Sequence, residues 1–98
     1  MNTKVKTYNT NGSVLYDGEV NDGTYNGMGT GYYSNGSIMY KGEWLENIYN
    51  GMGTLYSGGF TFYKGEWLKC TFNGIGTMYD PDDGSIVYEG KSQEGNIK

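Results

Sequence analysis

Apolar and polar residues alternate along most of this chain, in short runs separated by turns that contain glycine. Residues 38–44 read Ile-Met-Tyr-Lys-Gly-Glu-Trp, so every second side chain faces the same way when the run is extended. Between such runs lie Asn11-Gly12, Asn35-Gly36, Gly58-Gly59 and Asp83-Gly84. Pairs of this kind accept the positive φ angles of tight turns, and they therefore predict β-hairpins.

The same pattern returns at steps of 24, 23 and 25 residues. Tyr-x-Gly begins at Tyr16, Tyr40, Tyr63 and Tyr88, and Asn-Gly-x-Gly-Thr recurs in the same phase. A fixed period of this length is the signature of a repeat architecture. We expect one domain over residues 1–98, with hairpins at about 3–20, 27–44, 51–67 and 74–92.

The composition favours an all-β chain. Glycine accounts for 18 of 98 residues, and it costs about 1 kcal/mol per helical position relative to alanine. The 11 tyrosines, three phenylalanines and two tryptophans argue against disorder, which normally lacks aromatic residues. We therefore predict an elongated, curved antiparallel meander of about four stacked β-hairpins.

Period-2 alternation divides the second strand of each hairpin into an aromatic face and a charged face. In the second hairpin Tyr40 and Trp44 share the first face, whereas Lys41 and Glu43 are expected to face solvent on the other. We expect the aromatic stripe to form the core and its outer ring edges to line a groove for a partner. The candidate groove residues are Tyr16, Tyr40, Trp44, Tyr63, Trp67 and Tyr88.

A second ladder on the other face is an alternative contact surface, because methionine suits an adaptable interface. Its members are Tyr8, Met28, Tyr32, Met52, Tyr56 and Tyr79, together with Ile75. The sequence does not decide between the two faces.

The Gly-x-Gly pairs are predicted to serve packing. A bare glycine leaves a gap in the sheet surface where a ring from a neighbouring strand can lie against the backbone. The glycines expected to receive tyrosine and tryptophan rings are Gly27, Gly29, Gly51, Gly53, Gly74 and Gly76.

Nothing in the chain indicates catalysis. Without histidine, neither a serine nor Cys70, the single cysteine, has the base that such nucleophiles need. No helical pattern follows the Gly-x-Gly pairs, which argues against a nucleotide site. A polar turn explains the carboxylates of residues 80–84 without a metal ion. We expect no enzymatic activity, no catalytic residue, no cofactor and no metal.

The charge of the chain narrows the range of partners. Its net charge is −4, with seven lysines and no arginine, which disfavours nucleic acid and opposes binding to anionic membranes. The first residues lack an apolar signal core, and no stretch reaches membrane-spanning length. A lone cysteine fits a reducing compartment, and we predict a cytoplasmic protein.

The repeated phrase resembles a known family. Tyr40-Lys41-Gly42-Glu43-Trp44 followed by Gly51-Met52-Gly53 is similar to the MORN (membrane occupation and recognition nexus) repeat, and the likeness covers about residues 8–92. Departures from the pattern include Val20 in place of tryptophan and a polar last copy over 88–92. Asn47 and Cys70 stand where the first copy has Gly23. Because cysteine tolerates positive φ poorly, we expect the loop over 69–73 to be rebuilt.

The resemblance implies a scaffold without enzymatic activity of its own. We expect a non-catalytic protein–protein interaction or scaffold module that presents its aromatic groove to a protein or peptide segment. Three alternatives stay open: a self-assembling protein that forms dimers or filaments, a membrane-lipid recognition module, and a small inhibitor or antitoxin-type binder.

Overall fold

The computed structural model describes residues 2–93 and 96–97, with side chains described for residues 2–91. These residues form nine β-strands and no helix. The strands are β1 (Thr3–Tyr8), β2 (Val14–Asn21), β3 (Thr24–Tyr32), β4 (Ile38–Leu45), β5 (Ile48–Ser57), β6 (Phe60–Leu68), β7 (Thr71–Tyr79), β8 (Ile86–Gln93) and β9 (Asn96–Ile97).

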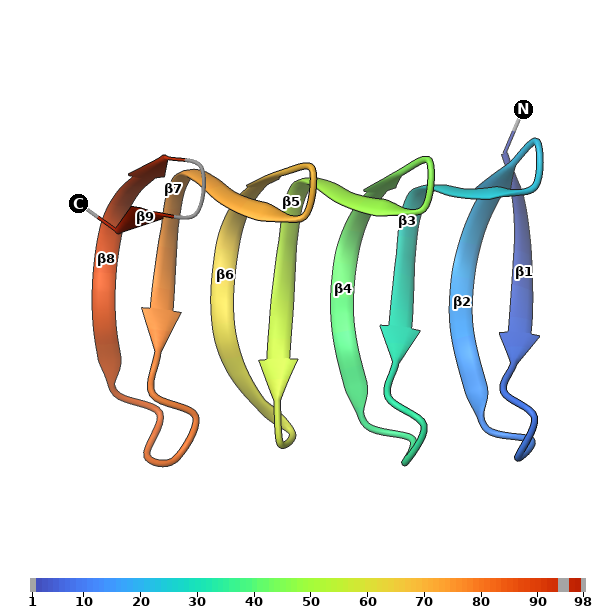
Figure 1. Ribbon diagram of the computed structural model, residues 1–98, viewed down its shortest axis with the longest axis horizontal. Helices are drawn as coiled ribbons and strands as arrows, with labels where there is room; N and C mark the ends of the chain where they lie inside the picture. Colours follow the sequence, from blue (N-terminus) through green and yellow to red (C-terminus); the bar gives the residue numbers. More distant parts are fainter. Residues whose placement is uncertain (1, 94–95, 98) are drawn as a thin grey trace.

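All nine strands belong to one antiparallel sheet, in which each strand pairs with its neighbours in sequence. The strands curve and lie side by side along the long axis of the molecule, with the two chain termini at opposite ends (Figure 1). The principal extents are 36 × 28 × 14 Å. The predicted all-β antiparallel meander is confirmed.

The predicted hairpins correspond to the pairs β1–β2, β3–β4, β5–β6 and β7–β8. The segments between them, expected as loops, are themselves tight turns. Leu45 pairs with Ile48, and the two residues between them, Glu46 and Asn47, have φ angles of 48° and 72°. Two successive left-handed residues are typical of a type I′ turn, which matches the twist of the flanking strands. The sheet is therefore continuous from one repeat to the next.

The loop that contains Cys70 is not rebuilt, so that expectation was wrong. Lys69 and Cys70 have φ angles of 50° and 64° and form the same two-residue turn. The Cys70 N–H donates to the carbonyl of Tyr49 at 2.9 Å, just as the Asn47 N–H donates to Tyr25 at 3.0 Å. These bonds to the preceding repeat hold the turn in place although cysteine disfavours its backbone conformation.

The core is a single ladder of aromatic rings on one face of the sheet, which we call the aromatic face. Its buried members are Tyr16, Tyr40, Trp44, Tyr63 and Trp67. Tyrosine rings stack on rings of the next strand, with centroid distances of 3.7 Å for Tyr16–Tyr25, 3.9 Å for Tyr40–Tyr49 and 4.3 Å for Tyr63–Phe72. The tryptophans meet these stacked pairs edge-on.

A row of glycines crosses the sheet beneath these rings. Its members pair with one another from strand to strand: Gly18, Gly29, Gly42, Gly53, Gly65, Gly76 and Gly90. A methyl group added at Gly53 would meet the hydroxyl, Cζ and Cε1 atoms of Tyr40. The same tyrosine hydroxyl donates to the carbonyl of Glu43 at 2.9 Å. The ring thus occupies the space that any larger residue would need.

Replacing Gly53 by alanine tests this contact. We expect Gly53→Ala to lower the free energy of unfolding by about 2–3 kcal/mol, because the added methyl displaces a buried ring. Gly59, in an exposed turn with φ +86° and open space around its Cα, is the control. Gly59→Ala carries only the backbone penalty, about 1 kcal/mol. Equal losses in urea denaturation would contradict the packing role of Gly53.

The turn at Cys70 yields a second prediction. Asn47 accepts the Tyr25 N–H with its side-chain oxygen at 2.7 Å, and Cys70 accepts the Tyr49 N–H with sulfur at 3.3 Å. Cys70→Asn introduces a residue that tolerates positive φ and has a stronger hydrogen-bond acceptor than sulfur. We expect it to raise the melting temperature by about 4 °C or more.

The reverse exchange, Asn47→Cys, is the matched control and should lower the melting temperature by a similar amount. If both exchanges shift it in the same direction, the account of the turn is wrong.

Candidate functional site

Five of the six rings proposed to line an aromatic groove belong to the core. Their exposed fractions lie between 0 and 8%, so they leave a partner very little ring surface. The sixth, Tyr88, is half-buried, and its hydroxyl donates to the carbonyl of Lys91 at 2.7 Å. The rings are buried because they cover one another, the tyrosines by stacking on rings of the next strand and the tryptophans by edge-on contacts. The aromatic stripe is the core rather than an open groove.

Three rings that stack on the buried tyrosines were missing from the predicted set: Tyr25, Tyr49 and Phe72. Each lies one residue before an Asn-Gly pair. That position was assigned to a connecting loop, whereas it belongs to a strand that pairs with the tryptophan strand, as Tyr49 does with Trp44. An aromatic residue before each Asn-Gly-x-Gly-Thr motif was the signal that identifies these stacking partners.

The opposite face carries the alternative ladder, whose residues form two separate rows at different positions along the strands. Met28, Met52 and Ile75 share one register, and their exposed fractions are 57, 53 and 67%. The tyrosines of the ladder lie about 13 Å farther along the strands, since four residues separate Met28 from Tyr32. Tyr8 is exposed, and the other three are half-buried: Tyr32, Tyr56 and Tyr79.

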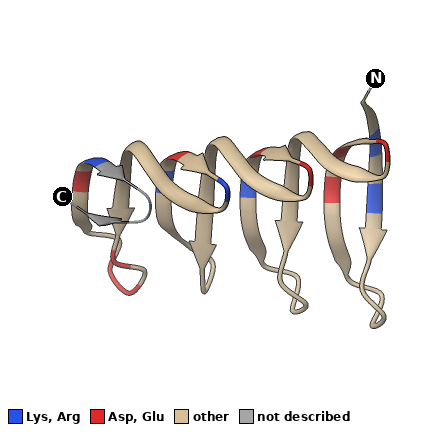
Figure 2. Cartoon of the chain, turned by 45° about the horizontal axis from the view of Figure 1, so that its top comes forward, with Lys and Arg blue, Asp and Glu red and all other residues tan. Residues whose placement is uncertain are grey.

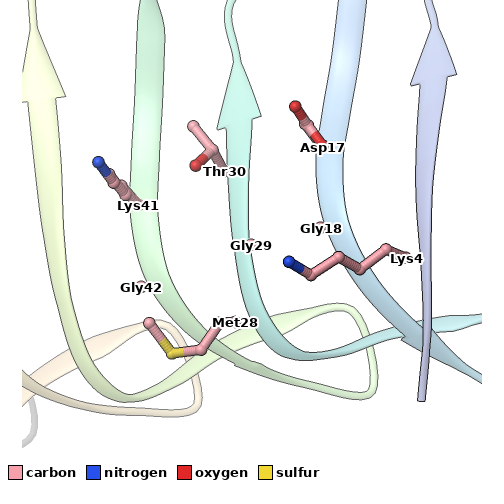
Figure 3. A pocket seen from close by; sticks show the side chains of 8 residues that line it. All are labelled: Lys4, Asp17, Gly18, Met28, Gly29, Thr30, Lys41 and Gly42. Carbon is pink, nitrogen blue, oxygen red and sulfur yellow. The ribbon is translucent and has the colours of Figure 1, made fainter.

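The methionines border two adjoining hollows on this opposite face. The first, of about 240 Å³, has the backbone of Gly18, Gly29 and Gly42 as its floor. Figure 3 shows Met28 on one side of these glycines and a row of polar side chains on the other. The remaining lining residues are Lys4, Asp17, Thr30 and Lys41.

The second hollow, of about 290 Å³, continues the first across the strands. It shares Met28, Lys41 and Gly42 with the first hollow and extends to Met52 and Lys64. Together the two hollows form a depression that runs from strand to strand over the glycine row, and we call it the transverse groove. One wall is the row that holds Met28 and Met52, whose cross-strand partners are Glu43 and Glu66, and the other is a row of lysine and threonine residues that begins at Asp17.

The glutamates that follow Tyr-x-Gly in the first three repeats are not simply solvent-facing charges, as was expected for Glu43. The Glu43 carboxylate accepts the backbone N–H of Met52 at 2.7 Å, and Glu66 accepts that of Ile75 at 3.0 Å. Glu19 does the same for Met28 at 2.7 Å. These bonds cross the register shifts that follow Gly18, Gly42 and Gly65.

The same carboxylates explain the first glycine of each Gly-x-Gly pair. Gly51 has a φ of +104°, and a Cβ there would meet the Glu43 carboxylate rather than an aromatic ring. Gly27 and Gly74 face Glu19 and Glu66 in the same way. The prediction that rings cover both glycines of a pair was therefore wrong for Gly27, Gly51 and Gly74, whereas tyrosine rings do cover Gly29, Gly53 and Gly76.

Burial raises the pKa values of three tyrosines in or beside the core. Desolvation, with a smaller contribution from Glu19, raises the pKa of Tyr16 to about 12. Desolvation, followed by the effect of Cys70, raises the pKa of Tyr49 to about 12, and burial likewise raises the pKa of Tyr40. These groups lie within the core and stay protonated near neutral pH.

The described residues contain no group of three histidine, cysteine, aspartate or glutamate side chains placed to hold a metal ion. Among these residues there is also no helix with the length and apolar character needed to cross a membrane.

A scan against models of protein families finds no match to this chain, and a search of curated proteins finds no match either. The likeness to MORN repeats therefore rests on the residues of the repeat.

The raised tyrosine pKa values predict loss of stability in alkali. Between pH 10, the ordinary tyrosine pKa, and pH 12 the folded chain holds protons that the unfolded chain has released. The free energy of unfolding should therefore fall as pH rises through this window. Urea denaturation at several pH values measures the slope.

Tyr49→Phe should reduce that slope by up to the contribution of one bound proton, because one titrating group is removed. Stability that stays constant from pH 10 to 12 would contradict the burial of these hydroxyls.

Proposed function

We propose that this protein is a non-catalytic interaction module that docks a protein or peptide segment in the transverse groove. The observation that carries the proposal is the exposed methionine row beside a hollow, in a chain whose aromatic stripe is buried in the core. Methionine is polarizable and flexible, and it is common at surfaces that accept partners. The floor of the groove is bare backbone, which allows close approach of another chain.

The groove is well suited to binding because its walls are fixed before a partner arrives. Glu43 and Glu66 hold the backbone at Met52 and Ile75, and the glycine row beneath is covered by buried rings. A preorganised surface loses little conformational entropy when it binds. The resemblance to MORN repeats, whose members serve as scaffolds, supports the same function, and a cytoplasmic location is proposed with it.

Self-assembly through strand addition is less well supported. The free edge of the sheet at β1 carries Lys4 and Lys6, both exposed, and lysine on an edge strand discourages pairing with another chain. The groove proposal needs no edge contact.

Removal of the methionine side chains tests the proposed function. We expect the double variant Met28→Ser/Met52→Ser to weaken capture of a protein partner from native lysate at least tenfold, because about 1–2 kcal/mol of apolar contact is lost at each position. Quantitative mass spectrometry of the captured proteins gives the measurement.

Phe60→Ser is the matched control, since Phe60 is 59% exposed and lies outside the transverse groove. It should leave capture unchanged. If the control loses partners as readily as the methionine variant, or if neither change matters, the groove is not the docking surface.

A further inference from the structure

The middle of the transverse groove carries two lysines at one register. Lys41 pairs with Thr54, and Thr54 pairs with Lys64, so the two lysines lie two strands apart on one wall. At the usual spacing between strands this separation is about 9.6 Å. Met28 and Met52 stand at the same two-strand interval on the facing wall. The groove therefore repeats a cation and an apolar contact with one common period.

These two lysines are not neutralised by the protein itself. Threonines are their cross-strand neighbours on both sides, and no carboxylate lines the second hollow. The nearest acidic residues along the same strands, Glu43 and Glu66, are bound to backbone N–H groups. Within the part of the chain that the structure describes, no ion pair joins either lysine to a carboxylate.

These two lysines belong to a molecule that is acidic as a whole. The chain has a net charge of −4, and Figure 2 shows acidic residues spread over the strands and gathered in the turn between β7 and β8. Along the register that holds the lysines, Asp17 lies two strands before Lys41 and has Lys6 as its other cross-strand partner, and Glu89 lies two strands beyond Lys64. From Lys6 to Glu89 the order of charges is therefore positive, negative, positive, positive, negative.

We propose that the transverse groove binds an acidic peptide segment, whose carboxylates pair with Lys41 and Lys64 and whose apolar side chains contact Met28 and Met52. This inference rests on the proposed function and adds the chemistry of the partner. The groove period of about 9.6 Å lies between seven residues of an α-helix, about 10.5 Å, and three residues of polyproline II, about 9.3 Å. A segment of either conformation presents acidic and apolar residues at the required interval.

A peptide fits this pattern better than an anionic membrane. Membrane surfaces attract clusters of four or more basic residues, whereas the two hollows are lined by three lysines, Lys4, Lys41 and Lys64, together with Asp17. Asp17 and Glu89, each two strands from the nearer lysine, disfavour an extended anionic surface but leave a short acidic stretch free to contact Lys41 and Lys64.

The test uses designed peptides and the full chain. One anionic probe is helical, with leucine and glutamate each recurring every seventh residue, and the other is proline-rich, with both recurring every third residue. Each has a counterpart in which lysine replaces glutamate. Fluorescence anisotropy should show at least one anionic probe bound about tenfold or more tightly than its cationic counterpart. The difference should shrink at high salt.

Charge reversal in the groove gives the decisive comparison. Lys41→Glu/Lys64→Glu should reverse the preference, so that the cationic probe binds more tightly. Lys6→Glu/Lys69→Glu changes the net charge equally, outside both hollows, and should leave the preference for the anionic probe in place. All four positions are exposed, and circular dichroism verifies that each variant is folded.

The outcomes separate the two proposals. If anionic and cationic probes bind equally and Met28→Ser/Met52→Ser weakens both, the groove is a docking surface but the acidic partner is wrong. If no peptide binds, while vesicles of phosphatidylserine do, the acidic-peptide proposal is overturned in favour of lipid. If peptides bind and neither the methionine nor the lysine variants matter, both proposals fail.

Discussion

The contact between a tyrosine ring and a pair of glycines on adjacent strands sets the geometry of this sheet. Gly42 and Gly53 lie opposite each other, and the ring of Tyr40 covers both of them. The ring is held at its far end by the hydrogen bond to the Glu43 carbonyl. A Cβ at Gly53 would meet the ring, and one at Gly42 would meet the backbone of Gly53 and Met52 as well as the Tyr40 hydroxyl, so the glycine row and the ring ladder depend on each other.

The same contact explains how a sheet of one layer has a core at all. The shortest extent of the molecule is 14 Å, which leaves no room for a second sheet at the usual distance of about 10 Å with its own side chains. Trp44 instead joins adjacent repeats. Its ring meets Tyr16 and Tyr40 edge-on, and its indole N–H donates to the carbonyl of Gly29 at 3.0 Å. Stability in this chain therefore comes from contacts between neighbouring repeats.

The sequence predicted the hairpins because turn pairs such as Asn35-Gly36 and period-2 alternation are local signals. It did not predict the bond from Glu43 to the Met52 N–H, because this bond arises at a register shift that only the paired strands define. The turn at Cys70 was also mispredicted, because it too depends on contacts between strands. Its own preference opposes the turn, but tertiary hydrogen bonds to Tyr49 outweigh that preference.

The choice between the two faces was the step that the sequence left open. Alternation places residues on one face or the other, but it does not indicate on which face the side chains bury one another. The buried face is the one on which rings from adjacent strands are in contact. Tyr25, Tyr49 and Phe72 stack on the tyrosine stripe, so this face is buried. Once these rings are paired, the stripe has little surface left, whereas Met28, Met52 and Ile75 stay exposed on the opposite face.

One structural element thus serves both faces. The backbone of Gly42 and Gly53 supports the ring of Tyr40 on the aromatic face and forms part of the groove floor on the other. A floor made of backbone has no rotamers to reorganise, and the buried ring behind it resists bending of the strands. The shape of the groove is therefore set by the packing of the core. A repeat that keeps its tyrosine and glycines also keeps a rigid site for the variable side chains, such as Met52 and Lys64, that select the partner.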